Sequence, residues 1–188
     1  MLVTPIVALW LVWSIGDGQA LNVTYLDLKL TITESDALAR WFGSAFAIVS
    51  FASALFALHQ KSRLELCAAQ MCAGAALGVV FAGDFITLFV FWEIMALAST
   101  FLIWSAGTAA VAPGMRYLLI HVLGGALLLS GIAGEFQATG SIAFSAMQPD
   151  SVARWLIFIG FLVNAAAPPL SVWLPDAYPK SSYSGMVV

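Results

Sequence analysis

The sequence predicts an all-α integral membrane protein, and three observations lead to that prediction. Of the 188 residues, 62% are hydrophobic and only 9% are charged, whereas soluble domains average about 45–50% apolar and about 25% charged residues. Several apolar stretches are long enough to cross a bilayer as helices. The last of these stretches contains three prolines and must be discontinuous. Together these features exclude soluble enzymes, nucleic-acid-binding proteins and disordered chains.

Six stretches are candidate transmembrane helices, because lipid requires every backbone polar group to be satisfied within the protein. They are residues 1–16, 41–58, 66–83, 85–106, 117–134 and 155–175. The first stretch lacks a basic leading region, so we expect an anchoring helix rather than a cleaved signal peptide. The two cysteines, Cys67 and Cys72, match no metal or redox spacing. We therefore expect neither a metal site nor a bound cofactor.

The segment 17–40 differs from the rest because apolar and polar residues alternate along it. Its apolar members are Leu26, Leu28, Leu30 and Ile32, and its polar members are Asp27, Lys29 and Thr31. A period of two predicts a strand or small hairpin at the membrane surface.

The distribution of basic residues predicts an orientation in the membrane. If the loops 59–65 and 105–116 are cytoplasmic, the cytoplasmic side carries four basic residues and the opposite side three. The cytoplasmic group is Lys61, Arg63, Arg116 and Lys180, and the opposite group is Lys29, Arg40 and Arg154.

Glu93 is the single charged residue of the stretch 85–106, and it lies nine residues after Asp84. At 1.5 Å per residue this is roughly 13 Å into the span. A carboxylate at that depth costs at least about 2.5 kcal/mol, so it either faces a polar interior or is protonated. Both conditions suit a proton carrier, whereas the structural alternative is a Glu that ties two helices together.

Two further polar groups are expected near mid-depth. His121 is a plausible proton relay or, alternatively, a neutral histidine hydrogen-bonded between helices. Asn164 precedes Pro168 and Pro169, which must interrupt the helix and expose backbone groups. Transporters use such interruptions at ion sites, although a simple packing kink is the alternative. Glu135 is expected at the membrane interface.

Three segments carry a family resemblance. GDFITLFVFWEIMALASTFLIW (83–104), RYLLIHVLGGALLLSGI (116–132) and LIFIGFLVNAAAPPLSVWLPDAYPKSSYSG (156–185) resemble successive helices of the antiporter-like membrane subunits. These subunits occur in respiratory complex I, in Mrp-type Na⁺/H⁺ antiporters and in membrane-bound hydrogenases. The D-type member of the Mrp-type antiporters is the most similar branch.

The resemblance implies roles for individual residues. Glu93 matches the proton-pathway glutamate of the family. Asn164 stands where the family has a lysine, and Ser171 stands where it often has a histidine. Neither replacement can bind and release a proton near pH 7, but both can bind water or a cation. The implied site comprises a proton pathway of Glu93, His121 and Asn164 and a broken-helix region of Pro168, Pro169, Ser171 and Asp176.

The resemblance also implies an organisation of the chain. We expect one transmembrane domain over residues 1–188, with leading helices in 1–58 and the start of the first five-helix repeat in 66–188. Family members contain two inverted repeats, so the sequence resembles only the N-terminal half, either as a fragment or as a half-length subunit.

The function implied is that of a subunit of a multisubunit Na⁺/H⁺ antiporter in a bacterial cytoplasmic membrane. Its expected partners are other membrane subunits, protons, Na⁺ and lipid, but not nucleic acid. Glu93 would take up a proton, and His121 and Asn164 would organise a water chain. Two alternatives remain: a proton-pumping arm of a complex I-like or hydrogenase complex, and a non-conducting scaffold. The sequence contains no nucleophile–base pair and no phosphate-binding loop, so we do not expect an enzyme that acts alone.

Overall fold

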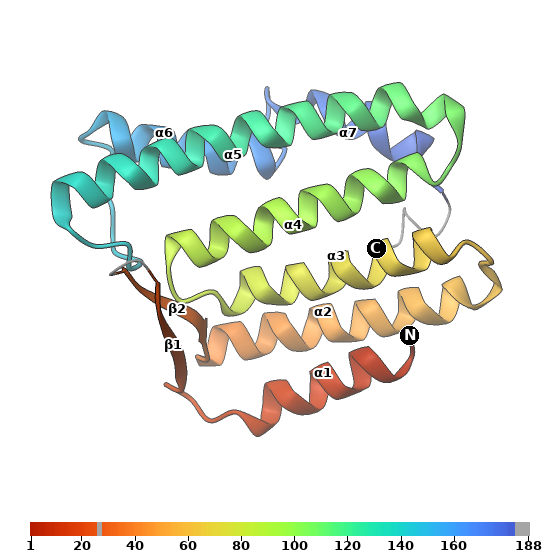
Figure 1. Ribbon diagram of the computed structural model, residues 1–188, viewed down its shortest axis with the longest axis horizontal. Coiled ribbons are helices and arrows are strands. Elements are labelled where there is room, and N and C mark those ends of the chain that lie inside the picture. Colours follow the sequence, from red (N-terminus) through yellow and green to blue (C-terminus); the bar gives the residue numbers. More distant parts are fainter. Residues whose placement is uncertain (26–27, 183–188) are drawn as a thin grey trace.

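The computed structural model describes residues 1–25 and 28–182. Helices α1 to α5 lie side by side in sequence order, and α6 packs along α5 (Figure 1). The helices are α1 Val3–Ser14, α2 Ala37–Phe56, α3 Arg63–Phe81, α4 Phe85–Trp104, α5 Val111–Thr139, α6 Val152–Asn164 and α7 Leu174–Ala177. The short 3-10 turns are η1 Ala57–His59, η2 Thr108–Ala110, η3 Ser171–Trp173 and η4 Tyr178–Lys180. The predicted helical class is therefore confirmed.

The predicted count of six spans is not confirmed. Four helical segments of the described chain are long and apolar enough to cross a membrane: 37–59, 63–81, 85–104 and 108–139. The other two apolar helices, α1 and α6, have 12 and 13 residues. At 1.5 Å per residue they extend about 18–20 Å, which is less than the ~30 Å hydrocarbon core.

Helix boundaries differ from the apolar windows because hydropathy alone does not set the ends of a helix. Ser62 caps α3 by accepting a hydrogen bond from the Glu65 amide, so the helix begins inside the expected loop 59–65. Helix α5 begins at Val111, inside the expected loop 105–116, and has 29 residues. It ends where Gly140 adopts a left-handed φ of 71°, the usual helix stop.

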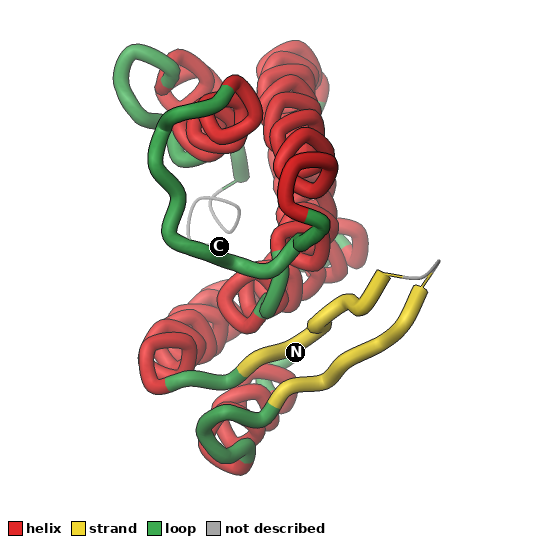
Figure 2. The backbone as a smooth tube through the Cα atoms, turned by 90° about the vertical axis from the view of Figure 1, so that its left-hand side faces the viewer, coloured by secondary structure: helices red, strands yellow, loops and turns green. Residues whose placement is uncertain are grey.

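The segment 17–40 contains the predicted hairpin. Strands β1 (Ala20–Tyr25) and β2 (Leu28–Glu34) pair antiparallel, with a register irregularity between Leu21 and Asn22. Leu26 and Asp27, which belong to the predicted alternation, lie outside the described residues. Figure 2 shows the hairpin beside the ends of the helices rather than among them.

A buried aspartate, Asp84, attaches the hairpin to the helices. It caps α4 by accepting hydrogen bonds from the Thr87 amide and hydroxyl at 2.7 and 3.0 Å, and it also accepts one from the Thr31 amide of β2 at 2.6 Å. The Phe85 amide donates to the Ile142 carbonyl after α5. One carboxylate therefore joins β2 to α4, and the next residue joins α4 to the α5–α6 connection.

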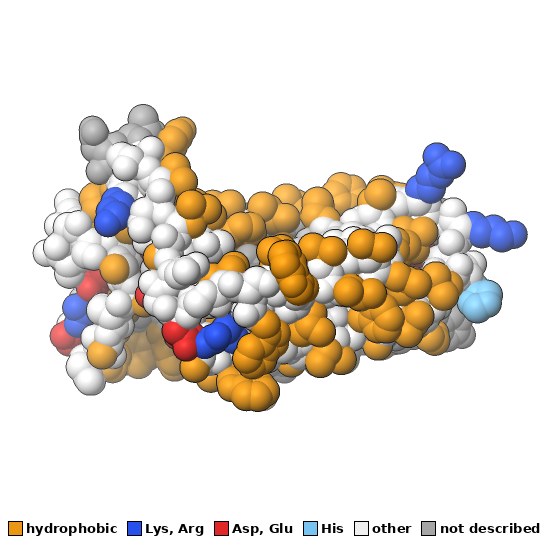
Figure 3. Space-filling model, turned by 90° about the horizontal axis from the view of Figure 1, so that it is seen from below, with side chains coloured by type: hydrophobic (Ala, Val, Ile, Leu, Met, Phe, Trp, Pro, Cys, Tyr) orange, Lys and Arg blue, Asp and Glu red, His pale blue; other side chains and the backbone are white. Residues whose placement is uncertain are grey.

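The outer surface fits a bilayer. Hydrophobic side chains cover the middle of the face drawn in Figure 3, and the coloured charged groups gather towards its two ends. Exposed large residues include Trp10 on α1, Trp41 on α2 and Leu123 on α5. An apolar surface of this extent is incompatible with water and typical of a lipid-facing surface. The chain is a membrane protein built from apolar helices.

The predicted span 155–175 is a helix for only part of its length. Helix α6 ends at Asn164, and Ala166, with φ of 52°, leaves the helical path. The chain then passes Pro168 and Pro169, whose peptide bond is cis, and resumes helical turns at η3. The discontinuity that the prolines predict is present, and α6 ends at Asn164 because the ring of Pro168 would clash with the carbonyl four residues before it in a continued helix.

Candidate functional site: a polar cavity at the break in α6

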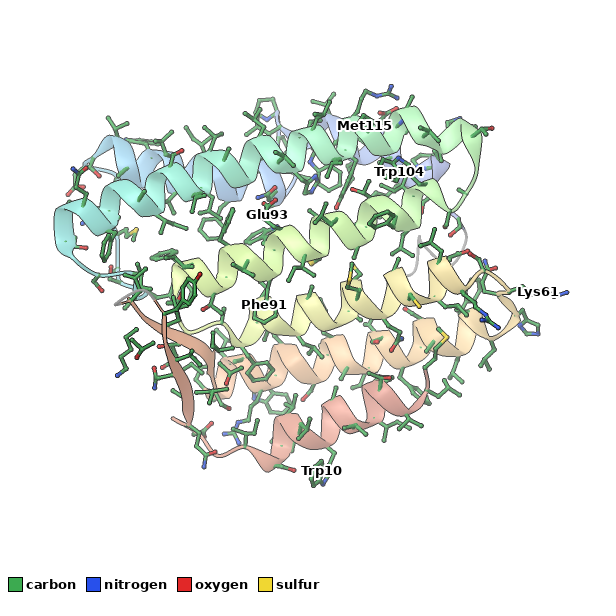
Figure 4. All side chains as sticks on the ribbon, in the orientation of Figure 1. Trp10, Lys61, Phe91, Glu93, Trp104 and Met115 are labelled. Carbon is green, nitrogen blue, oxygen red and sulfur yellow. The ribbon has the colours of Figure 1, made fainter. Side chains whose placement is uncertain are left out.

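Glu93 is the ninth residue of the 20-residue helix α4 and so lies near its middle. Its side chain extends between α4 and α5 (Figure 4). A Cβ built on Gly125 of α5 would overlap the Glu93 carboxylate, so only glycine allows this approach. Glu93 has no hydrogen-bond or ion-pair partner within residues 1–25 and 28–182. A carboxylate at this depth without a counter-charge is energetically expensive and is unusual outside functional sites.

Asn164, the last residue of α6, reaches the neighbouring position of α5. Its Oδ1 would lie 2.8 Å from a Cβ built on Gly124. Neither Oδ1 nor Nδ2 has a hydrogen-bond partner among the described residues, although Asn164 is only 8% exposed. Glu93 and Asn164 therefore meet α5 at consecutive residues, which differ by about 1.5 Å in height along the helix.

Glycines allow α5 and α6 to approach closely at this level. A Cβ built on Gly160 of α6 would lie 2.9 Å from the Gly124 carbonyl oxygen and 2.8 Å from the Leu128 nitrogen. Nearby, the rings of Trp92 on α4 and Phe161 on α6 lie 5.2 Å apart. The three helices thus meet where Glu93 and Asn164 lie.

A cavity of about 240 Å³ adjoins this meeting point. His121 and Asn164 both line this cavity, whereas Glu93 is not among its lining residues. The lining residues are Cys72, Trp92, Met95, Ser99, Leu102, Ile103, Tyr117, His121, Asn164, Trp173, Tyr178 and Ser181. None of these described residues is Lys or Arg, and the described chain contains no group of three or more His, Cys, Asp or Glu that could bind a metal ion.

His121 is held firmly in the wall of this cavity. Its Nδ1 lies 2.9 Å from the Tyr117 carbonyl oxygen, and since a carbonyl only accepts, Nδ1 carries the proton. The ring stacks on Tyr117 with centroids 3.9 Å apart and meets the edge of Trp173 at 4.6 Å. In the neutral ring, Nε2 is therefore the acceptor.

The segment after the break forms another wall of the cavity. Trp173 of η3 donates from Nε1 to the Val163 carbonyl of α6 over 3.2 Å, which holds η3 against the end of α6. Ser171 begins η3 but is not among the residues that line the cavity. Ser181, beyond η4, does line it, and its hydroxyl is buried without a partner in the described chain.

Asp176 lies in α7 and pairs with Arg116 of α5 rather than facing the cavity. The hydrogen bonds from this guanidinium, followed by its charge and that of Lys180, hold the pKa of the Asp176 carboxyl below its usual value. The pair closes a contact between residues that are 60 positions apart. Asp176 therefore positions the broken segment and is not part of the polar cavity.

Glu135 has a comparable structural role at the opposite end of α5. Its carboxylate accepts hydrogen bonds from Arg154 Nε and Nη2 at 3.0 and 2.9 Å, and Arg154 also pairs with Asp150. This network joins the end of α5 to the start of α6.

Sequence reasoning missed several residues of the site. The pair Gly124 and Gly125 could have been noticed, because two adjacent glycines inside an apolar helix indicate close approach of another group. Tyr117 is one helical turn before His121 and could have been inferred as its neighbour. Ser99 and Ser181 gave no signal, because only the tertiary fold brings α4 and the end of the described chain to one cavity.

The fold and the site define a class of protein: a membrane protein of several helices with an ionisable side chain in the middle of one helix and a break in another. The family model for the transmembrane region of NADH:quinone oxidoreductase and Mrp antiporter subunits matches residues 82–188. The chain belongs to this family.

Curated relatives and solved structures agree with that membership. Over 126 residues, which are 58% of this chain and 16% of the relative, the chain is 35% identical to Na⁺/H⁺ antiporter subunit A1 of Staphylococcus epidermidis. Over 164 residues, 80% of this chain and 30% of the relative, it is 28% identical to a probable K⁺/H⁺ antiporter subunit, of the D type, from Rhizobium meliloti. The chain thus spans less than a third of each relative.

The fold is shared with a subunit of the Mrp complex from Dietzia sp. DQ12-45-1b. The TM-score is 0.82 at 26% sequence identity, and the match covers 97% of this chain and 22% of that one. The helical row, the hairpin and the broken helix described here therefore correspond to one part of a longer subunit architecture.

Proposed function

We propose that this chain forms part of a subunit of a multisubunit cation/proton antiporter and provides a mid-membrane proton pathway. The observation that carries the proposal is Glu93, a carboxylate in the middle of α4 with no partner in the described chain. Asn164, which meets α5 one residue away, has two buried polar atoms without a partner in the described chain and lines a cavity large enough for several waters. The names of the relatives are consistent with this function.

In the proposed pathway, the Glu93 carboxylate takes up a proton and becomes neutral, and it later releases that proton to water in the adjoining cavity. His121 accepts a hydrogen bond from that water at Nε2, because its Nδ1 proton is committed to the Tyr117 carbonyl. Asn164 orients the same water, since its amide both donates and accepts. Ser171 is separate from these groups, and Asp176, Pro168 and Pro169 support the break.

We also propose that the chain crosses the membrane six times. Helices α1 and α6, with the turns beyond the break, would complete six crossings of a bacterial cytoplasmic membrane. The apolar exposed side chains on α1 and α6 support this placement, including Trp10 and Phe158. Other membrane subunits and Na⁺ would be its partners.

The test of the proposal is cation/proton exchange by the complete complex in everted membrane vesicles. Glu93→Gln keeps the size of the side chain and removes its ability to ionise, so exchange should be lost while the complex still assembles. Wild-type exchange in an assembled Glu93→Gln complex would contradict the proposal and favour a scaffold.

A redox-driven proton pump is the second candidate, because the matched family also includes NADH:quinone oxidoreductase. The two candidates differ in what drives the ions. An antiporter exchanges cations for protons in vesicles energised only by an imposed pH gradient. A redox pump moves protons only when an electron donor and acceptor are supplied, and its redox subunits should copurify.

A further inference from the structure

The cavity beside the break contains more unsatisfied polar atoms than any other part of the described chain. The buried side-chain atoms without a partner there are Oδ1 and Nδ2 of Asn164 and Oγ of Ser181. Both residues line the same cavity of about 240 Å³. Burying such atoms without partners costs free energy, so a polar occupant is required.

The local electrostatics favour a positive occupant. Asn164 is the C-terminal residue of α6, and the C-terminal end of a helix carries partial negative charge. Glu93 meets α5 one residue from the point where Asn164 does. No Lys or Arg of the described chain lines the cavity; Arg116, at the start of α5, is committed to Asp176. Any negative charge on Glu93 therefore lacks a fixed counter-charge.

The available ligands suit a hard monovalent cation. Oxygen atoms come from the amide of Asn164 and the hydroxyl of Ser181, and the Ser99 hydroxyl, which interacts with Tyr117 and with Cys72 Sγ at 3.4 Å, lies in the same wall. Tyr117 and Trp173 add aromatic rings to the same wall. Broken helices in transporters use helix C-terminal ends and free oxygens to bind Na⁺.

We propose that the cavity at the end of α6 binds one alkali cation, Na⁺ or K⁺, through Asn164 Oδ1 and Ser181 Oγ. The bound cation supplies the positive charge that Glu93 lacks. Water alone would satisfy the orphaned atoms but would leave the carboxylate uncompensated. This inference rests on the proposed function, because it identifies where the exchanged cation meets the proton-binding carboxylate.

The test is equilibrium binding of radioactive Na⁺ to the purified complete complex, with K⁺ and choline as competitors in separate arms. Choline is too large and cannot accept oxygen ligands closely, so only alkali cations should compete. Asn164→Leu should remove one bound cation per subunit. Asn164→Asp, which keeps the oxygen and adds a charge, should tighten binding several-fold.

Two serines provide a matched pair for the same measurement. Ser181→Ala removes a proposed ligand and should weaken binding several-fold. Ser130→Ala removes an exposed hydroxyl that donates to the Ala126 carbonyl of its own helix and lies outside the cavity, and it should leave binding unchanged. If Asn164→Leu prevents assembly, Asn164→Asp and Ser181→Ala still decide the question.

Unchanged affinity and stoichiometry in Asn164→Asp and Ser181→Ala would overturn the cation site and indicate water as the sole occupant. That result is separate from the proposed function, because binding is measured at equilibrium without transport. Loss of exchange in Glu93→Gln together with unchanged binding in both cavity variants would leave the proton pathway standing without this cation site.

Discussion

Arg116 donates two hydrogen bonds to Asp176, from Nε to Oδ2 over 2.6 Å and from Nη2 to Oδ1 over 2.8 Å. The pair ties the beginning of α5 to α7, the helical turn that follows the break in α6. Tyr117, the residue after Arg116, and Trp173, which precedes α7, both line the cavity. The ion pair therefore fixes the distance between two walls of the site.

This ion pair should stabilise the protein in a pH-dependent way. The Arg116 hydrogen bonds lower the pKa of Asp176 in the folded protein. A lowered folded-state pKa gives stability that is present above the ordinary pKa and is lost as the pH falls through the lowered value. Asp176→Asn should therefore reduce the thermal midpoint near neutral pH, and its difference from wild type should shrink below about pH 4.

Thermal midpoints of the wild-type and Asp176→Asn complexes across a pH series check this prediction. Asp150→Asn is the control, because Asp150 is an exposed carboxylate whose partner Arg154 keeps a second partner in Glu135. An Asp176→Asn difference that stays constant into acid would show that the ion pair does not account for the stabilisation.

Because Glu93 lies so close to Gly125 of α5, adding a single methyl group at Gly125 should reduce exchange. In Gly125→Ala, the new Cβ would overlap the Glu93 carboxylate, so that side chain must move away from its position against α5. Exchange should fall several-fold. Gly74→Ala is the matched control, since a Cβ there meets no atom within 4 Å. Equal exchange rates in the two variants would mean that the position of the carboxylate is unimportant.

The Asp84 contacts predict a strong dependence of stability on this carboxylate. Asp84→Ala removes the buried α4 cap and the part-buried bond to the Thr31 amide, and should cost at least about 2 kcal/mol. Asp36→Ala removes only an exposed cap on α2 and should cost about 1 kcal/mol. Thermal unfolding and the protease sensitivity of the hairpin measure the loss in each variant. Similar losses in the two variants would show that Asp84 does not hold the hairpin to α4.

Much of the fold follows from local sequence patterns. Apolar windows with at most one charged residue located the helices, and the alternation around Leu28 and Leu30 located the hairpin. Helix ends were less accurate. The start of α5 at Val111 lies before Arg116, since a helix continues through charged residues at the membrane interface, where hydropathy gives no boundary.

The site was predictable only as single residues. Glu93, His121 and Asn164 stand out because polar groups in apolar segments are expensive. Their arrangement depends on tertiary contacts that sequence spacing does not encode, such as the approach of Glu93 to Gly125. For the same reason the sequence does not reveal that Asp176, in the broken-helix region, pairs with Arg116 of α5.

The most direct test of the account compares cation/proton exchange in everted vesicles for wild type, Glu93→Asp and Glu93→Gln at equal levels of assembled complex. An ionisable carboxylate at this position is the central claim, so Glu93→Asp should retain part of the exchange and Glu93→Gln should retain none. Glu135→Gln, at a carboxylate paired with Arg154 outside the cavity, should still exchange. Wild-type exchange in Glu93→Gln would contradict the account.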